Sequence, residues 1–280
     1  MQSPPIRNLD QHVVDGFGDE WTRFDQSEVD QRELQRGFDE YFAIFPWEKL
    51  RPDAVGFDLG CGSGRWARFV APRVGQLHCI DASPAALQVA RRNLAPFANC
   101  VFDQASVDEM PLPDGSAQFG YSLGVLHHVP DTAAAIRACV KKLEQGAPLL
   151  LYLYYRFDNR PGWYAAIWKI SEWPRRFISR LSSGPRAAVC GLIAVLVYWP
   201  LARLSRLIDA LGAPGDRLPL HYYSRRSLYT MRNDALDRFG TALEQRFTRA
   251  EIERMMREAG LRDIIFSDRP PYWCAVGIRE

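Results

Sequence analysis

Short apolar runs alternate with amphipathic stretches between residues 54 and 155. The runs are rich in Val, Ile, Leu, Phe and Tyr, a pattern typical of strands that are covered on both faces. They predict strands at residues 54–59, 77–80, from 101, 119–122 and 149–155. Helical periodicity falls between them, at residues 65–70, 84–93 and 131–142. Ser83 and Asp131 stand where helix N-caps belong.

This alternation predicts a doubly wound α/β fold, with an open and mostly parallel sheet. In such sheets ligands bind beyond the carboxyl ends of the strands, where the strand order reverses. We therefore expect the functional site to follow Leu59, Ile80, the third strand and Ser122.

The C-terminal segment returns to a regular pattern. Thr248 and Glu251 have the spacing of a capping box, and Gly260 suits the left-handed residue that ends a helix. Two apolar runs at 261–266 and 273–278 predict an antiparallel hairpin at a sheet edge. Residues 247–280 are therefore expected to complete the core sheet.

Two segments do not show this alternation. Residues 1–53 predict an N-terminal helical cap, with one helix over 31–45. Residues 156–246 are rich in Trp, Tyr and Arg and predict a helical insertion that covers the substrate as a lid.

The insertion contains an uncharged run at residues 187–202, interrupted by Pro200. A membrane-spanning helix needs about 20 apolar residues, so the run is too short to span. We expect a helix buried under the lid. The alternative is an interfacial membrane helix, flanked by Arg186, Arg203 and Arg206.

The 35 Lys and Arg residues nearly balance the 33 Asp and Glu residues, so the net charge of +2 does not indicate a nucleic-acid partner. The distribution is uneven, however. Residues 1–54 carry 6 basic and 12 acidic side chains, whereas residues 152–240 carry 14 and 6. This asymmetry indicates either an anionic partner or membrane surface near the basic segment, or ordinary solvated helix faces.

The six cysteines form no C-x-x-C pair, and the five histidines lack metal-ligand spacing. We expect no disulfide framework, no metal site and a cytoplasmic protein with reduced thiols. The first residues contain no apolar run of the kind found in a secretory signal peptide. The oligomeric state is not indicated.

Three alternate glycines, Gly60, Gly62 and Gly64, follow the first strand and precede a helix. Glycine there permits positive φ and close approach of the backbone to a ligand. Asp81 ends the next strand, where a carboxylate can accept both hydroxyls of a ribose. Together these features predict a nucleoside-containing ligand.

Dinucleotides and S-adenosylmethionine both bind in this geometry. The dinucleotide pattern is G-x-G-x-x-G, and here the third glycine comes one residue early. Asp58 precedes the loop, where a carboxylate suits a cationic amino group better than a pyrophosphate. The sequence therefore favours S-adenosylmethionine over a nicotinamide cofactor.

Four segments carry a family resemblance: DLGCGSG at 58–64, CIDAS at 79–83, MPLPD at 110–114 and VLHHVPD at 125–131. Together they resemble class I S-adenosylmethionine-dependent methyltransferases of the small-molecule type, the type 11 group. The resemblance covers residues 54–155 well and 247–279 loosely. It implies a Rossmann-like, mostly parallel sheet of seven strands that ends in an antiparallel hairpin.

The resemblance also implies roles for the cofactor residues. The loop Gly60–Gly64, with Cys61, would pass under the methionine part, and Asp58 would face its amino group. Asp81 would hold the ribose, and Ala82 would lie beside the adenine. Where relatives have an Asp for the adenine amino group, this chain has Ser106, followed by Val107. Gly120 stands where the relatives usually have another Asp. The backbone at Leu123 and Gly124 would then form that part of the wall of the cofactor site.

Methyl transfer requires alignment of the acceptor and exclusion of water, and it needs a general base when a hydroxyl must lose its proton. His127 and His128 follow the fourth strand and are candidates for that base, although such a pair also shapes turns. Tyr154 is a further catalytic candidate and Tyr155 a substrate-binding candidate; both close the fifth strand, where alternation predicts opposite faces.

The candidate substrate residues lie in the cap and the lid. Trp21 belongs to a segment that is expected to fold over the cofactor, and the lid contributes a polar and aromatic cluster that would bind an apolar or anionic small molecule. The cluster comprises Tyr222, Tyr223, Arg225 and Arg226.

We infer a methyltransferase with an oxygen or nitrogen acceptor. A methyltransferase of lipid-linked or membrane-surface substrates and a nicotinamide-dependent oxidoreductase on the same sheet remain the alternatives.

Overall fold

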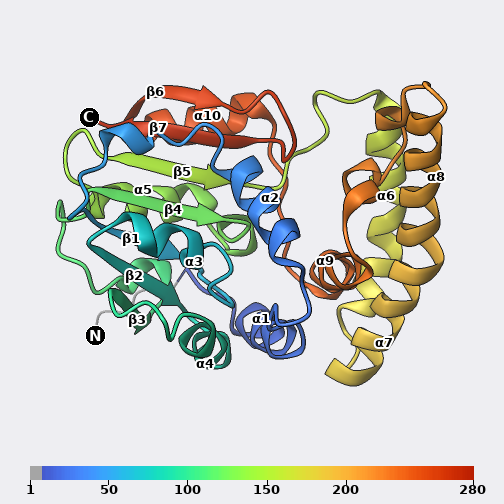
Figure 1. Cartoon of the computed structure of the whole chain (residues 1–280), viewed down its shortest axis with the longest axis horizontal. Coiled ribbons are helices and arrows are strands. Elements are labelled where there is room, and N and C mark those ends of the chain that lie inside the picture. Colours follow the sequence, from blue (N-terminus) through green and yellow to red (C-terminus); the bar gives the residue numbers. More distant parts are fainter. Residues whose placement is uncertain (1–7) are drawn as a thin grey trace, which may run out of the picture.

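The computed structural model describes residues 8–280, and its centre is one seven-stranded sheet (Figure 1). The strand order is β3-β2-β1-β4-β5-β7-β6, with β1 to β5 parallel and β7 antiparallel to both β5 and β6. The predicted doubly wound fold with a C-terminal hairpin is confirmed. The strands are β1 Val55–Leu59, β2 Gln76–Asp81, β3 Cys100–Gln104, β4 Phe119–Leu123, β5 Pro148–Tyr152, β6 Leu261–Phe266 and β7 Cys274–Arg279.

Apolar clusters cover both faces of the sheet. One cluster joins the strands to helices α5 and α10, and the other joins them to α2, α3 and α4. Ser83, Asp131 and Thr248 cap their helices as predicted, and Gly260 has φ +89°. The core helices are α3 Ala67–Val70, α4 Pro84–Asn93, α5 Thr132–Lys142 and α10 Arg249–Glu258.

The N-terminal segment forms two helices, α1 Gln11–Arg23 and α2 Gln31–Tyr41. The second ends earlier than the predicted 31–45, and the first was not predicted from its sequence. Helix α1 packs against α4 and contacts helix α9 of the lid, so the cap lies between core and lid. Residues 1–7 of the predicted cap, and the expectation about a signal peptide, fall outside the described residues.

The lid is built from α6 Gly162–Ile178, α7 Ser183–Ile193, a π-helical turn Ala194–Tyr198, α8 Trp199–Ala210 and α9 Leu228–Gly240. Helix α9 lies between the core and an outer layer formed by α6, α7 and α8 (Figure 1). Short 3₁₀ helices occur at Trp47–Lys49, Ala71–Arg73, Val107–Glu109, Leu126–His128, Gly215–Arg217 and His221–Arg225.

The expectation of a buried helix at residues 187–202 is wrong for the side of the helix that faces away from α9. Residues Ser183–Ala210 form one continuous helix, the only one among the described residues that is long and apolar enough to cross a membrane. Cys190, Ala194 and Ala202 are buried against α9, but Leu192 and Leu196 are exposed. A helix that packs against one neighbour covers only one side, so its other apolar side remains open.

Candidate active site

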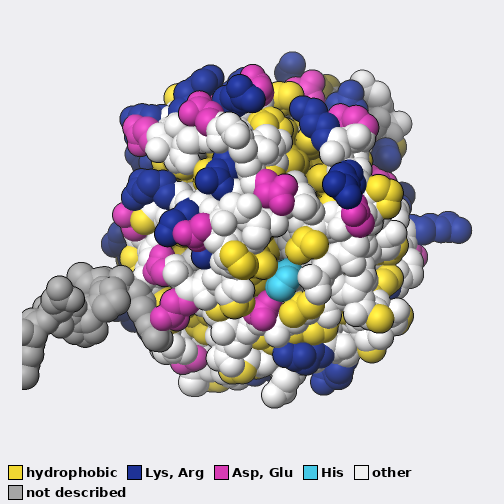
Figure 2. All heavy atoms as spheres, turned by 90° about the vertical axis from the view of Figure 1, so that its left-hand side faces the viewer, with side chains coloured by type: hydrophobic (Ala, Val, Ile, Leu, Met, Phe, Trp, Pro, Cys, Tyr) yellow, Lys and Arg dark blue, Asp and Glu magenta, His cyan; other side chains and the backbone are white. Residues whose placement is uncertain are grey.

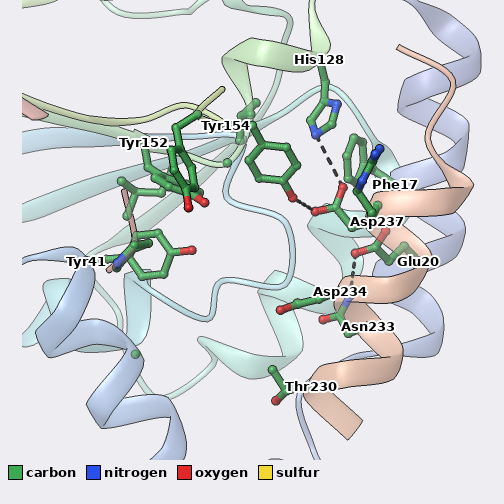
Figure 3. Close-up of a pocket in the computed structure, with 18 of the residues that line it drawn as sticks. Phe17, Glu20, Tyr41, His128, Tyr152, Tyr154, Thr230, Asn233, Asp234 and Asp237 are labelled. Atoms are coloured by element: carbon green, nitrogen blue, oxygen red, sulfur yellow. Dashed lines mark hydrogen bonds and ion pairs between the residues drawn. The ribbon is translucent and has the colours of Figure 1, made fainter. Parts of the chain in front are cut away.

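A cavity of about 650 Å³ opens beyond the carboxyl ends of the strands, between the core, the cap and the lid (Figure 3). This volume is in the range of small-molecule sites, roughly 300–1,000 Å³. Its walls come from β1, β2, β4, β5, α1, α2, α6, α8 and α9. The position agrees with the site that the alternating pattern predicts.

The glycine loop needs glycine for both backbone conformation and space. Gly60, Gly62 and Gly64 have φ values of +74°, +54° and +75°. A Cβ on Gly62 would lie 2.7 Å from the Trp21 ring, and a Cβ on Gly64 would lie 2.8 Å from Leu94. The loop is therefore shaped by its packing neighbours, while its Gly60 edge still faces the cavity.

Asp81 links this loop to helix α4 and also lines the cavity. One carboxylate oxygen accepts the Gly62 N–H at 2.9 Å, and the other accepts the Ser83 N–H at 2.8 Å. Burial raises the pKa of Asp81, and these two donors oppose that rise. A carboxylate oxygen can accept more than one hydrogen bond, so the group can still receive donors from a ligand.

The predicted cofactor residues separate into two groups. Asp58, Gly62 and Gly64 do not line the cavity. Asp58 is buried in the core and accepts the Tyr121 hydroxyl at 3.0 Å, and burial raises its pKa to about 8. The lining of the cavity therefore does not support the predicted contact of Asp58 with a cationic amino group. The residues that do line the cavity are Gly60, Cys61, Asp81, Ala82, Ser106, Val107 and Leu123.

Arg65 is a cavity residue that sequence reasoning did not select. Its guanidinium lies 5.1 Å from the Trp21 ring centre and 4.7 Å from that of Trp66. Within residues 8–280, no carboxylate lies within ion-pair distance of it. From the sequence, an arginine after a glycine loop has the pattern of a solvent-exposed residue. Its place at the cavity wall follows only from the fold.

Tyr154, Asp237 and His128 lie together on the cavity wall (Figure 3). The Tyr154 hydroxyl donates to one oxygen of Asp237, and His128 Nε2 lies 3.5 Å from the other. His128 Nδ1 donates to the Leu243 carbonyl at 2.7 Å, since a carbonyl can only accept. With its proton on Nδ1, a neutral His128 has a lone pair on Nε2. Nε2 and the Asp237 oxygen can therefore form a hydrogen bond only when one of them carries a proton.

Burial raises the pKa of Asp237, whereas the nearby His128 and the Tyr154 hydroxyl act to lower it. His128 is 3% exposed, and its Nε2 has no hydrogen-bond partner in the described part of the chain. His128 and Asp237 both line the cavity, and their facing atoms, His128 Nε2 and one Asp237 oxygen, are buried without a hydrogen-bond partner among residues 8–280. Asp237 was missed in the sequence, because an acid on a lid helix has the pattern of a solvent-facing charge.

His127 is not at the cavity, in contrast to the prediction of a catalytic role for either histidine. It is fully buried, and its ring stacks on Tyr154 with 3.8 Å between centroids. Its Nδ1 accepts the Tyr154 N–H at 3.4 Å, and burial lowers its pKa well below the ordinary value. His127 is therefore a neutral support for Tyr154.

Two further acids, the buried Glu20 and the half-buried Asp234, line the cavity near Asp237 (Figure 3). Glu20 accepts a hydrogen bond from Asn233 at 2.6 Å, and burial raises its pKa well above the usual range. Burial also raises the pKa of Asp234 to about 6, although Tyr223 donates to it and Arg65 is near. Neither Glu20 nor Asp234 was predicted from the sequence.

The predicted substrate residues are only partly gathered at the cavity. Trp21, Tyr155, Tyr222, Tyr223 and Arg226 line it. Because β5 ends at Tyr152, the expected alternation does not continue, and Tyr154 and Tyr155 both reach the cavity.

The two arginines of the predicted cluster differ. Arg225 is exposed and lies outside the cavity, which corrects its assignment. Arg226 is buried, forms an ion pair with Glu40 and donates to the Glu33 carbonyl at 3.2 Å. Its charge is already balanced by a partner, so the prediction that it binds an anionic substrate loses its main support.

Comparisons with known proteins agree with this geometry. Residues 57–151 match the family model described as a methyltransferase domain. The chain is 36% identical over 95 residues to the ubiquinone biosynthesis O-methyltransferase of Alkalilimnicola ehrlichii. It is 26% identical over 191 residues to the ajmaline N-methyltransferase of Rauvolfia serpentina. These alignments cover 33% and 64% of this chain, and 38% and 63% of the relatives.

Two solved structures share the fold. One is a protein from Haloferax volcanii described as a methyltransferase, in complex with the activator Trm112. It has a TM-score of 0.55 and 16% identity, and the match covers 95% of this chain and 96% of that one. The other is a protein from Bacillus halodurans described as a methyltransferase, with a TM-score of 0.51 and 15% identity over 83% of this chain and 72% of that one. Residues 57–151 of this chain therefore match a methyltransferase domain, and the chain shares the fold of these two solved structures.

Proposed function

We propose that this protein transfers a methyl group from S-adenosylmethionine to an oxygen or nitrogen atom of a small molecule. The observation that carries the proposal is that one cavity is lined both by Gly60 and Asp81 and by the His128–Asp237 pair. A nucleoside-binding edge and a proton-accepting group thus face the same space. The matched family is a methyltransferase domain, so the oxidoreductase alternative is not pursued.

The cofactor would lie along the carboxyl ends of β1 and β2. Asp81 would accept the ribose hydroxyls, and Ser106 with Val107 would border the adenine. Arg65, a cation without a carboxylate partner among residues 8–280, would pair with the carboxylate of the methionine part. The chemistry that S-adenosylmethionine supplies there is an activated methyl group.

The chain's own residues would then prepare the acceptor. The His128–Asp237 pair would accept the proton that a hydroxyl loses during transfer, because both side chains lie on the cavity wall with His128 Nε2 3.5 Å from an Asp237 oxygen. Tyr154 holds the Asp237 carboxylate by its hydrogen bond. The lid helices exclude water from the cavity, which strengthens each of these interactions.

The cavity walls favour an aromatic or apolar acceptor that carries a hydroxyl or an amine. Tyrosine rings from β5, α2 and the lid face the space, and the charge of Arg226 is already balanced. The two named relatives are an O- and an N-methyltransferase, which supports an acceptor of this kind. We also propose that the protein is cytoplasmic, because cysteine thiols stay reduced there.

Calorimetric titration of S-adenosylmethionine into the full chain tests the cofactor assignment. We expect 1:1 binding that is lost in Asp81→Ala and retained in Asp103→Ala, because Asp103 lies on the neighbouring strand β3, pairs with His78 and does not line the cavity. Transfer of a labelled methyl group to a panel of phenols and amines then tests the reaction. Absence of binding by the wild-type chain, or full binding by Asp81→Ala, would refute the proposal.

A further inference from the structure

The outer layer of the lid exposes an apolar surface, here called the outer lid face. Of the 16 large exposed hydrophobic side chains among the described residues, 14 lie between residues 163 and 211. Ile170 is 74% exposed and Leu196 is 69% exposed. The outer lid face comprises Trp163, Ile167, Ile170, Trp173, Phe177, Leu181, Leu192, Val195, Leu196, Val197, Trp199, Leu204, Leu207 and Leu211.

These side chains are arranged as stripes and not scattered. On α6 the spacing of Trp163, Ile167, Ile170, Trp173 and Phe177 follows the helical repeat, so the residues share one side. On the long helix the π-helical turn Ala194–Tyr198 inserts an extra residue and rotates the following residues by about 100°. That rotation keeps the later leucines on the side that carries Leu192 and Leu196.

The opposite side of the long helix is buried in the protein interior. Cys190, Ala194, Tyr198 and Ala202 pack in a cluster with Met231 and other residues of α9. Crossing a bilayer would strip these contacts and place the buried Arg186 in lipid. The helix is therefore suited to lying on a membrane surface with its exposed side and not to spanning it.

Basic side chains surround the outer lid face. In residues 161–217 the exposed charged groups are five basic and two acidic: Lys169, Arg176, Arg180, Arg206 and Arg217 against Asp209 and Asp216. The end of the molecule opposite the lid differs, since positive and negative side chains are interspersed there among scattered hydrophobic ones (Figure 2). The lid end combines apolar stripes with an excess of exposed basic side chains, and this combination complements anionic lipid headgroups.

We propose that the outer lid face docks on the surface of an anionic lipid bilayer. Trp, Phe, Ile and Leu side chains enter the boundary between headgroups and acyl chains, and the surrounding Lys and Arg side chains contact the headgroups. This docking does not depend on methyl transfer, because none of the side chains at the glycine loop takes part.

The cavity opens at this surface. Ile167 and Val197 are exposed members of the outer lid face, and they also line the cavity. Helix α6 forms part of the wall there, since Trp168 lines the cavity and Ile170 is exposed outside it. If the proposed function holds, an acceptor dissolved in the lipid enters the cavity without passing through water.

Vesicle flotation with the full chain tests the docking. The probes are vesicles of phosphatidylcholine alone and of phosphatidylcholine with phosphatidylglycerol. We expect the wild-type chain to float with the anionic vesicles, and the double variant Ile170→Glu/Leu196→Glu to bind them at least about tenfold more weakly. Both positions are exposed and outside the cavity, so far-ultraviolet circular dichroism and S-adenosylmethionine binding should remain at wild-type values.

Ile265→Glu is the matched control, because Ile265 is 56% exposed on β6, away from the lid. It should float like the wild-type chain. Equal flotation of the double variant and the wild type, or no flotation of the wild type, would overturn the docking proposal. So would a concentration-dependent dimer that the double variant abolishes, because the face would then bind a second copy. Flotation without cofactor binding would overturn only the proposed function.

Discussion

The Tyr154 hydroxyl donates a hydrogen bond to the Asp237 carboxylate across 83 residues of sequence. Tyr154 lies just beyond β5 in the core, and Asp237 lies on helix α9 of the lid. His128 approaches the same carboxylate from the loop after β4. The candidate proton acceptor thus exists only when lid and core are assembled.

Tyr154→Phe should move the pH dependence of methyl transfer to higher pH. The Tyr154 hydroxyl stabilises the ionised Asp237 carboxylate, so its removal raises the pKa of Asp237 further. The rate that depends on the deprotonated pair then increases only at higher pH. Profiles of kcat/KM against pH measure the shift, with Tyr152→Phe as control because Tyr152 also lines the cavity. An unshifted Tyr154→Phe profile would count against the assigned proton acceptor.

His128→Gln should reduce kcat by about 10²-fold or more for a hydroxyl acceptor, which is the ordinary size of a general-base contribution. Binding of S-adenosylmethionine should be unchanged, since His128 lies on the acceptor side of the cavity. His78→Gln provides the comparison, because His78 on β2 pairs with Asp103 on β3, away from the cavity. Rapid-quench measurement of a single turnover separates the chemical step from binding. A wild-type turnover rate in His128→Gln would exclude the general-base role.

Asp58→Asn should remove a pH dependence of folding stability. Burial raises the pKa of Asp58 to about 8 in the folded chain, from an ordinary value of about 3.8. The folded state therefore holds the proton that the unfolded state loses, and stability decreases as pH rises from about 4 to about 8. The loss in the wild type is on the order of a few kcal/mol.

Urea unfolding at pH 5 and pH 8, without cofactor, measures this effect. The free energy of unfolding of Asp58→Asn should change less between the two pH values than that of the wild type. Identical changes in both proteins would show that Asp58 is not the titrating group.

Gly62→Ala should destabilise the glycine loop more than an alanine at an open position with positive φ. Gly146 has φ +81° with no atom within 4 Å of an added Cβ, so Gly146→Ala should cost about 1–2 kcal/mol from backbone strain alone. At Gly62 the clash with Trp21 adds about 1–3 kcal/mol and displaces the cavity edge. Thermal unfolding and S-adenosylmethionine titration measure both effects, and equal results for the two variants would contradict the role of Trp21.

The core could be predicted from sequence because its signals are local. Helix α4 and strand β6 were predicted with their observed bounds, since Ser83 caps the first and a Pro-Pro loop follows the second. The glycine loop and Asp81 could be placed at one edge because parallel strands end together. Helix α1 was missed, since its glycines and mixed polarity obscure the helical repeat.

The chemical side of the site could be predicted for residues that follow core strands, and aromatic residues of the cap and lid such as Trp21 and Tyr222 were also predicted at the cavity. His128 and Tyr154 were selected because they follow such strands. Asp237 and Glu20 were missed because each lies on a helix, and Arg65 because it lies in the turn before α3; a charged residue at such positions has the same pattern whether it faces water or a cavity. Asp58 and Arg225 were misplaced for the related reason that position along the chain does not give the direction of a side chain.

What the sequence alone determined is the sheet, its caps and the cofactor edge, because hydrophobic period, glycine conformation and capping residues act over a few neighbouring positions. Only the tertiary structure decided which acids enter the cavity and which side of the long lid helix stays exposed. Both depend on how α9 packs between core and outer layer, and that packing sums weak contacts between segments that are distant along the chain.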